Sequence, residues 1–324
     1  MNFQIRPCTS TLAEYNAITA IQNAIWQTEG PTGERRQLQD AGRNPAFLFQ
    51  RLLVEYERQI VAHAAYGEDA WNHTPGKYFI DIEVHPDFQR QGIGEALYTQ
   101  IVATLAGRAP TPVFFTANTR EDHPGGLALL HKHGFRQVMR NPMSRVDVRA
   151  FDATRFAAAQ EKVRQAGITL HSMSELKQRD PAWIRHWYDL ELAINDDHPM
   201  PDRGDPLPYE TFAGFMDTGL VNTDAAFFAL DADGNYVGQS TLEVPDPGSK
   251  TIMVGMTGVL RPYRRMGIAT ALKVRAIEFA KVYGAEWILA GNEENNPMFQ
   301  LNLRLGFQPM PAWLNFEKRF DTER

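Results

Sequence analysis

The feature that most constrains this chain is a glycine-bearing segment that occurs twice. Residues 84–97 read VHPDFQRQGIGEAL, and residues 259–272 read VLRPYRRMGIATAL. In each copy an apolar run leads in, a helical pattern follows, and a valine precedes the glycine by eight residues. Such a turn at a helix N-terminus presents unpaired backbone N–H groups and the positive end of the helix dipole. Each copy therefore predicts a binding site for a phosphate.

A second pair of matching positions lies downstream of the two turns. Gly134-Phe135 follows Gly92 by 42 residues, and Gly306-Phe307 follows Gly267 by 39 residues. A glycine just past a helix end, followed by an apolar residue that opens a strand, is ordinary helix-stop chemistry. Its recurrence in register with the phosphate turn predicts a duplicated α/β unit.

The pattern of the turn, Gln or Arg, two residues, Gly, one residue, then Gly or Ala, is weak when it occurs once. Average composition gives roughly 0.3 accidental matches in a chain of this length. Two copies, each between a strand and a helix, are hard to obtain by chance. A Rossmann site is disfavoured because neither copy reads G-x-G-x-x-G, and a Walker A loop is excluded because neither turn contains Gly-Lys-Ser/Thr.

Length and composition fit two soluble domains. A chain of 324 residues is comfortable for two domains that each bury a core, and we place the boundary near residue 150, between domains 1–150 and 151–324. A formal charge of −6 argues against a nucleic-acid or membrane-surface partner. With Cys8 as the single cysteine, no intrachain disulfide or cysteine-rich metal site is possible. No signal peptide or membrane span is evident, so we expect a cytoplasmic protein.

Both halves repeat one order of elements. Each begins with a strand and helices, continues with a hairpin and a third strand that leads into the glycine turn, and ends with a strand, a helix and terminal strands. We expect Asn141-Pro142 to interrupt the last strand of the first half, and two separate strands at 307–310 and 313–320. Residues 151–167 read as a solvated linker helix.

This arrangement resembles the GNAT superfamily of acyl-CoA N-acyltransferases, in tandem. In that family the turn binds the pyrophosphate of coenzyme A, and the strand before it splays from its neighbour to receive the pantetheine arm. The resemblance implies an α/β (α+β) fold of two tandem GNAT domains, each a mixed, mostly antiparallel central sheet flanked by helices. By architecture the chain looks like the mycothiol-synthase-like acetyltransferases, although no motif fixes that substrate.

The second half is the closer match to the family. Asn295, Met298, Asn302 and Gly306-Phe307 follow a known variant pattern, N-x-x-M-x-x-x-N-x-x-x-G-F, whereas His123 and Leu130 stand where the first half would need the two asparagines. The implied coenzyme A contacts are Val84, Gln89, Arg90, Gln91, Gly92, Ile93 and Gly94 in the first half, and Val259, Arg264, Arg265, Met266, Gly267, Ile268, Ala269, Asn292, Asn295 and Asn302 in the second. The first half is accordingly expected to be degenerate and the second catalytic.

The expected chemistry is direct attack of an amine on the thioester of acetyl-CoA. An alkyl amine with a pKa near 10.4 must first lose a proton, and a carboxylate commonly serves as the base. Asp81 and Glu83 are candidates in the first half, because residues two apart on a strand point to one face, away from Ile80 and Ile82. Glu243 is the candidate in the second half. Asp196, Asp197 and His198 lie in the loop where the family receives its acceptor.

The assignment of a general acid fails at this point. The family often uses a tyrosine four residues before the glycine of Gly-Phe, and here that position is Leu130 or Asn302. Tyr98, Tyr263 and Tyr283 are on or beside the turn helices and are expected to pack or to face solvent.

Three functions remain open. The first is an acetyltransferase for a small-molecule amine, the second a non-catalytic protein that binds or senses acyl-CoA, and the third a nucleotide-binding regulator. No metal site is expected, because His131 and His133 are two apart on a helix and do not face each other, and no H-E-x-x-H motif occurs.

Overall fold

The computed structural model describes residues 2–70, 72–201, 204–217 and 221–320. These residues form two compact units. Unit 1 takes Met1–Asn141, Met200–Leu207 and Pro311–Arg324, and unit 2 takes Pro142–Pro199 and Pro208–Met310. The boundary at residue 150 stays a prediction about the duplicated halves, since the compact units exchange short segments of chain.

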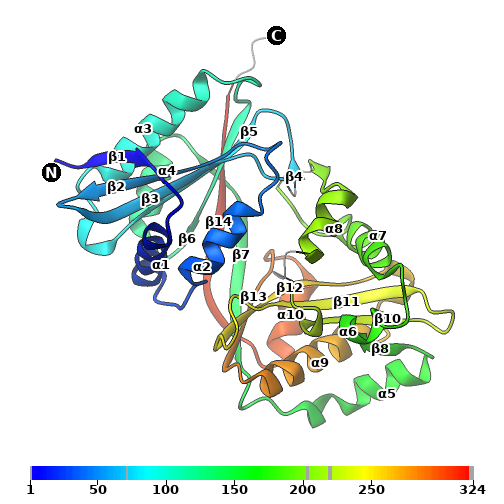
Figure 1. Cartoon of the computed structure of the whole chain (residues 1–324). Coiled ribbons are helices and arrows are strands. Elements are labelled where there is room, and N and C mark those ends of the chain that lie inside the picture. The colour runs from blue at the N-terminus through cyan, green and yellow to red at the C-terminus, as the bar shows by residue number, and fades with distance from the viewer. Residues whose placement is uncertain (1, 71, 202–203, 218–220, 321–324) are drawn as a thin grey trace. The chain divides into compact units, whose positions relative to one another are not determined.

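Unit 1 has one mixed sheet with helices on both faces (Figure 1). Its strands lie in the order β1-β2-β3-β5-β6-β14, antiparallel except for the parallel pair β5 and β6. The elements are β1 (Gln4–Pro7), α1 (Leu12–Trp26), α2 (Gly33–Ala41), β2 (Phe49–Tyr56), β3 (Gln59–Gly67), β4 (Asn72–His73), β5 (Lys77–Val84), η1 (Pro86–Phe88), α3 (Ile93–Ala106), β6 (Phe114–Arg120), α4 (Pro124–Lys132) and β14 (Gln308–Arg319). A short β9 (Asp205–Pro206) pairs with β4.

Unit 2 repeats the same plan. Its strands lie in the order β8-β10-β11-β12-β13-β7, again antiparallel except for one parallel pair, β12 and β13. The elements are β7 (Arg136–Asp147), η2 (Ala153–Phe156), α5 (Ala157–Gln165), β8 (Thr169–Ser172), α6 (Met173–Leu176), α7 (Trp183–Asn195), α8 (Tyr209–Asp217), η3 (Thr223–Ala225), β10 (Ala226–Leu230), β11 (Tyr236–Glu243), β12 (Thr251–Val259), η4 (Arg261–Tyr263), α9 (Ile268–Tyr283), β13 (Trp287–Gly291) and α10 (Pro297–Arg304). The predicted mixed, mostly antiparallel sheets are confirmed.

Two predicted strand breaks are wrong, and both lie at prolines. β7 runs unbroken through Pro142, and β14 runs unbroken through Pro311. The chain passes from one unit to the other at each of these prolines. Proline lacks a donor but keeps its carbonyl, and Pro142 uses that carbonyl to accept a hydrogen bond from the Asn292 N–H at 3.2 Å. An extended proline is therefore tolerated where the neighbour needs only an acceptor.

The predicted linker helix is also corrected, because α5 is part of the core of unit 2. Val163 on α5 is buried, and Phe151 and Phe156 just before it pack against the same apolar cluster. These side chains form an apolar face on the segment. The prediction missed it because alanine and charged residues dominate the composition of the segment.

Each sheet separates two packing faces. In unit 1, Leu97 and Ile101 of α3 pack with Ile80 on one face, while α1 lies on the other face against β3 and β5. In unit 2, α9 packs its buried residues against β11 and β12, and α7 lies on the opposite side of β11 (Figure 1). The turn helix and the first helix thus cover opposite faces of each sheet.

Candidate functional site

The two central parallel strands part in both units. β5 and β6 pair at Lys77–Phe114, Tyr78–Phe115 and Phe79–Thr116 and no further along their length. β12 and β13 pair in the same way over Thr251–Trp287, Ile252–Ile288 and Met253–Leu289. Beyond these points each sheet opens, and backbone groups on the inner edges become available to a ligand.

The predicted glycine turns lie at the open ends of these strands. Gly92 and Gly267 are the N-cap residues of α3 and α9, with φ of 84° and 89°. This left-handed conformation is strained for residues with a side chain, which explains the glycines. The first helical hydrogen bonds run from the Ala96 and Ala271 N–H groups to the Gly92 and Gly267 carbonyls. The N–H groups ahead of them have no partner within their helices.

The first residue of each turn motif ties the turn to the preceding strand. Gln89 Nε2 donates to the Val84 carbonyl at 3.0 Å, and Arg264 Nε donates to the Val259 carbonyl at 3.0 Å. A carbonyl oxygen has two lone pairs, so both valines can still accept a bond from a ligand. Ile93 and Ile268 bury their side chains beside the turns and hold the helix starts in place. Arg90, Gln91 and Arg265 have exposed side chains, and Met266 and Ala269 are half-buried.

The turn of unit 2 is more crowded than that of unit 1. A Cβ added to Gly267 would lie 3.2 Å from the Ala159 carbonyl of α5, whereas one added to Gly92 would meet nothing within 4 Å. Lys162 donates to the Arg265 carbonyl at 2.8 Å. Asp197, from the end of α7, is paired with both Arg261 and Arg264. Hydrogen bonds from these two arginines lower the pKa of Asp197 to about 2.

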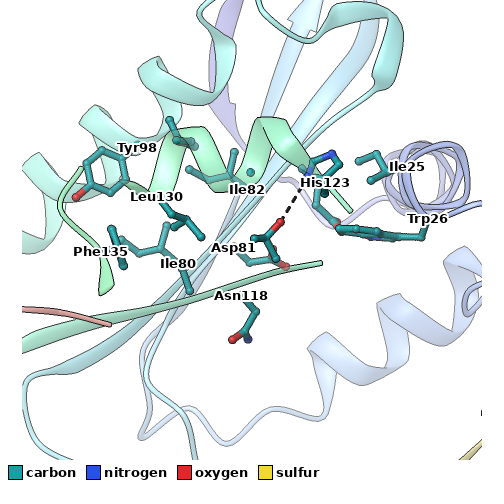
Figure 2. Close-up of a pocket in the computed structure, with 15 residues that line it drawn as sticks. Ile25, Trp26, Ile80, Asp81, Ile82, Tyr98, Asn118, His123, Leu130 and Phe135 are labelled. Carbon is teal, nitrogen blue, oxygen red and sulfur yellow. Dashed lines mark hydrogen bonds between the residues drawn. The ribbon is translucent and has the colours of Figure 1, made fainter. Parts of the chain in front are cut away.

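A pocket occupies the parted strands of unit 1 (Figure 2). Ile80–Glu83 of β5 and Ala117–Thr119 of β6 form its walls. Ile25 and Trp26 of α1 and His123 at the start of α4 lie at one end, and Tyr98, Leu130 and Phe135 lie at the other. The end towards α3 has the apolar side chains of Leu130 and Phe135, whereas the imidazole of His123 stands at the end towards α1.

Glu83 is held firmly as a carboxylate. Trp26 Nε1 donates to it at 2.7 Å, Gln22 Nε2 donates to its other oxygen, and His63 Nε2 lies 2.8 Å away. Burial alone would raise the pKa of Glu83, but these contacts outweigh it and hold the pKa below the usual range. Such a carboxylate is a weak base and serves mainly to fix α1 against β5.

Asp81 lies on the same face of β5 as Glu83 and opposite Ala65, as the period of two requires. Its side chain is exposed to the pocket, and it has no hydrogen-bond or ion-pair partner among the described residues. Desolvation by the surrounding protein is the main effect that raises the pKa of Asp81 above its usual value, and the negative charge of Glu83 raises it further. Burial lowers the pKa of His123, which stands 3.5 Å from the Thr119 hydroxyl.

Unit 2 contains a half-buried carboxyl, Glu191, that the sequence analysis missed. Glu191 of α7 accepts a hydrogen bond from Gln239 Nε2, and Gln239 pairs with Gly258, the residue before Val259. Burial raises the pKa of Glu191. The sequence did offer one indication of this difference, because Gly258 stands at the position that Glu83 has in the first half. A side chain does not fit there, since a Cβ on Gly258 would lie 2.2 Å from Ile194 of α7. A carboxylate absent from the strand could have been sought on the facing helix.

Glu243 lies at the end of β11, on the same face as Gln239 and Thr241. Between them β12 carries a bulge, because Ser240 pairs with Thr257 but Leu242 pairs with Val254. Thr241 Oγ1 accepts from the Met256 N–H at 2.9 Å and so holds the bulge. Glu243 is exposed and has no hydrogen-bond or ion-pair partner in the described part of the chain. The protein around its carboxyl group displaces part of the surrounding water, and this desolvation raises the pKa of Glu243.

The three asparagines of the second half separate into a pair and a single residue. Asn302 Nδ2 donates to Asn292 Oδ1 at 2.7 Å, and Asn302 Oδ1 is buried without a partner. Asn295 is exposed, and both its N–H and its amide donate to Glu293. The structure therefore brings Asn292 and Asn302 together beside the end of β13 and leaves Asn295 apart.

Within the described ranges, no group of three or more His, Cys, Asp or Glu side chains is arranged to hold a metal ion. The same residues include no helix with the length and apolarity needed to cross a bilayer.

Comparisons with known proteins agree with this geometry. The profile of the acetyltransferase (GNAT) family matches twice, at residues 15–135 and 184–307. A mycothiol acetyltransferase from Salinispora arenicola (strain CNS-205) is 26% identical over 256 residues, which cover 74% of this chain and 72% of that protein.

Two solved structures share the fold over almost the whole chain. A tandem GNAT protein from the clavulanic acid biosynthesis pathway superposes with a TM-score of 0.74 at 17% identity, covering 100% of both chains. A GCN5-related N-acetyltransferase from Sphaerobacter thermophilus gives 0.71 at 18% identity, covering 98% of this chain and 95% of the other. With two family matches that coincide with the two glycine turns, the chain belongs to the GNAT acetyltransferase family as a tandem of two such domains.

Proposed function

We propose that this protein is an acetyl-CoA-dependent N-acetyltransferase that acts on a small-molecule amine, and that transfer takes place in unit 2. One observation carries the proposal: β12 and β13 part after Met253 and Leu289, beside a helix start whose N–H groups have no partner within the helix. That combination suits a donor with a diphosphate at one end and an extended amide-bearing arm.

The residues of the turn would hold the donor. N–H groups of Arg265, Met266, Gly267, Ile268 and Ala269 would face the diphosphate, and the side chains of Arg264 and Arg265 would add charge. The backbone of Val259 would meet the amides of the pantetheine arm. Asn292 and Asn302 would line the far side, whereas the bonds of Asn295 to Glu293 make it the weakest of the proposed contacts.

Glu243 is our choice for the base of unit 2. It is free to accept a proton, it is reached by water, and its raised pKa brings it closer to that of an alkyl ammonium. Glu191 lies on the same side of the sheet but is bound to Gln239, so we assign it to holding α7 and to attracting a cationic acceptor.

The class of acceptor follows from that side of unit 2. Glu191 and Glu243 supply negative charge suited to an ammonium group. The similarity to a mycothiol acetyltransferase makes small-molecule acceptors of that kind the first to test. A cytoplasmic location remains part of this proposal.

A second function is favoured for unit 1, namely binding of acyl-CoA without transfer. Its turn is open and its strands form a pocket, so Val84 and Gln89 to Gly94 can receive the same donor (Figure 2). Leu130 stands at the position of Asn302, however, and the end of the pocket around it is apolar. Asp81 is the better candidate base here, and Glu83 the poorer, if unit 1 does transfer.

The test follows free thiol from acetyl-CoA across a panel of amines, with the acetylated product identified by mass. Glu243→Gln should lower kcat by about 100-fold, Glu191→Gln should mainly raise KM for the amine, and Glu278→Gln, an exposed change on α9, serves as the control. Binding of acetyl-CoA with no thiol release across the panel would leave the acyl-CoA-binding function instead.

The nucleotide-binding alternative is tested separately by thermal shift. Acetyl-CoA should stabilise the protein, and neither ATP nor NAD should displace it. Displacement of acetyl-CoA by either nucleotide at comparable concentration would contradict the assignment of both turns.

A further inference from the structure

Lys273 is the least expected residue in the core of unit 2. It lies on α9 with 3% of its surface exposed, and its ammonium stands 6.0 Å from the centre of the Phe307 ring. The described residues offer it neither a hydrogen bond nor an ion pair. Burial lowers the pKa of Lys273 to about 7. An unpaired buried lysine is costly, which points to a role that justifies its position.

The internal repeat indicates what Lys273 faces. Lys273 stands at the same place relative to Gly267 as Tyr98 does relative to Gly92. Figure 2 shows Tyr98, Leu130 and Phe135 together at the apolar end of the pocket in unit 1. Their counterparts in unit 2 are Lys273, Asn302 and Phe307, so the repeat places the lysine at the corresponding end of the parted strands β12 and β13.

A second unpaired polar group lies at this end. Asn302 is fully buried, and its Oδ1 has no partner, although its Nδ2 is bound to Asn292. In unit 1 the same two positions hold Leu130 and a tyrosine whose hydroxyl accepts a bond from Lys318 Nζ at 3.2 Å. The end of the parted strands in unit 2 thus has a buried acceptor without a partner, Asn302 Oδ1, and a lysine without an ion pair, which is the expected state of a site that binds a polar ligand.

The reaction proposed above requires a proton donor that the family pattern does not supply here. When the amine nitrogen bonds to the acyl carbon, the carbon–sulfur bond breaks and its electron pair goes to sulfur. The proton lost by the amine goes to Glu243, and the thiolate needs a proton from elsewhere. The position where the family often has a tyrosine holds Asn302, whose amide cannot give up a proton to the thiolate.

Resting on that proposed function, we infer that Lys273 is the proton donor of unit 2: its ammonium transfers a proton to the departing thiolate of coenzyme A, giving the free thiol and a neutral lysine. A thiol has a pKa near 8.5, so a lysine ammonium with a pKa near 7 is acid enough to protonate the thiolate.

The matched pair Lys273→Phe and Lys273→Tyr tests this role. Both rings have nearly the same volume, and Tyr98 shows that an aromatic ring fits this place in the fold. The phenylalanine variant should lose about 10- to 100-fold in kcat, and the tyrosine variant should recover most of that loss because it restores a proton. Binding of coenzyme A, measured by calorimetry, should change little in either variant.

Equal kcat values for the two variants, or a phenylalanine variant as fast as wild type, would overturn the inference. Lys273→Met, of similar length and without a proton, gives the same answer if either aromatic variant folds poorly. These outcomes are distinct from failure of the proposed function, in which wild type itself releases no thiol with any amine. Acetylation of Lys273 by acetyl-CoA alone, seen by peptide mass, would show a nucleophile in place of a proton donor and would also overturn the inference.

Discussion

Unit 1 and unit 2 place a carboxyl at the same point of the same fold, buried in unit 1 and half-buried in unit 2, but on opposite elements. In unit 1 the carboxylate of Glu83 is on the strand and the amide of Gln22 is on the helix. In unit 2 the carboxyl of Glu191 is on the helix and the amide of Gln239 is on the neighbouring strand. The exchange keeps one amide–carboxyl contact between helix and sheet in each unit.

The surroundings of the two groups give them different properties. Glu83 has Trp26 and His63 as additional partners, and its pKa is held low, whereas Glu191 has a raised pKa. A duplicated scaffold can thus keep its packing while the acid–base character of the site changes. The other end of the parted strands differs as well, apolar in unit 1 and polar at Lys273 and Asn302 in unit 2.

The largest expected difference between the units is in turnover when each turn is blocked. Gly267→Trp should lower turnover by about 1,000-fold or more, because the indole would fill the proposed acetyl-CoA site of unit 2, where transfer takes place. Gly92→Trp should leave most of it. Steady-state thiol release measures both.

Because Gly267 packs near Ala159, its variant needs a folding control. Circular dichroism and the melting temperature of each variant provide it. If Gly92→Trp removed turnover and Gly267→Trp did not, the transfer site would belong to unit 1.

The carboxyls of Glu83 and Glu191 should differ in what they contribute to stability. Glu83→Gln should lower the free energy of unfolding by about 3 kcal/mol at pH 7. A carboxyl with a depressed pKa stabilises the fold above its unfolded pKa, and this contribution is lost as pH falls. Glu191→Gln should cost less than about 1 kcal/mol, since a raised pKa means that ionisation at pH 7 already opposes folding. Urea titration of both variants decides, and equal losses would contradict the comparison.

Lys273 should make the stability of unit 2 depend on pH. Its pKa falls from 10.5 to about 7 in the fold, so the fold disfavours the charged form. Stability is then lost as pH drops from the unfolded value towards the folded one. Lys273→Met should raise the free energy of unfolding by about 2 kcal/mol at pH 6, and the gain should be much smaller at pH 10, close to the unfolded pKa. Denaturant titrations at the two pH values measure this, and a gain of the same size at both would argue against a buried titrating amine.

The smallest effect is expected at Asp197. Its pairs with Arg261 and Arg264 occupy arginines beside the turn of unit 2, and unit 1 has no counterpart, since Gln89 stands at the position of Arg264. Asp197→Asn should therefore tighten coenzyme A binding by about threefold at low salt, with less effect at high salt. Calorimetry with Gly92→Trp as the background isolates the site in unit 2, and weaker binding would contradict the idea that Asp197 competes with the diphosphate.

Much of the fold was predictable from local signals. The turns at Gly92 and Gly267 and the Gly-Phe pairs indicated the repeat, and the hairpin expected in each half corresponds to β2–β3 and to β10–β11. The exchange of end strands between the units was not predictable, because it joins Trp313 to Arg120 across most of the chain length. Pro142 and Pro311 therefore predicted strand breaks that do not occur, because pairing with strands distant in the sequence keeps β7 and β14 continuous.

The candidate site was predictable only in part. The period of two placed Asp81 and Glu83 on one face, but it could not tell the free carboxyl from the one fixed by Gln22 and Trp26. Glu191 on its helix had no distinguishing pattern, because its meaning depends on Gln239 across the sheet. Such differences arise from burial and partners, which a single sequence does not display.

The most direct test of the account compares Glu243→Gln with Asp81→Asn in one assay of thiol release from acetyl-CoA, with the best amine of the panel. We predict that Glu243→Gln loses about 100-fold in kcat while Asp81→Asn stays within about threefold of wild type. Loss in Asp81→Asn with normal turnover in Glu243→Gln would contradict the account and place the transfer site in the pocket of unit 1.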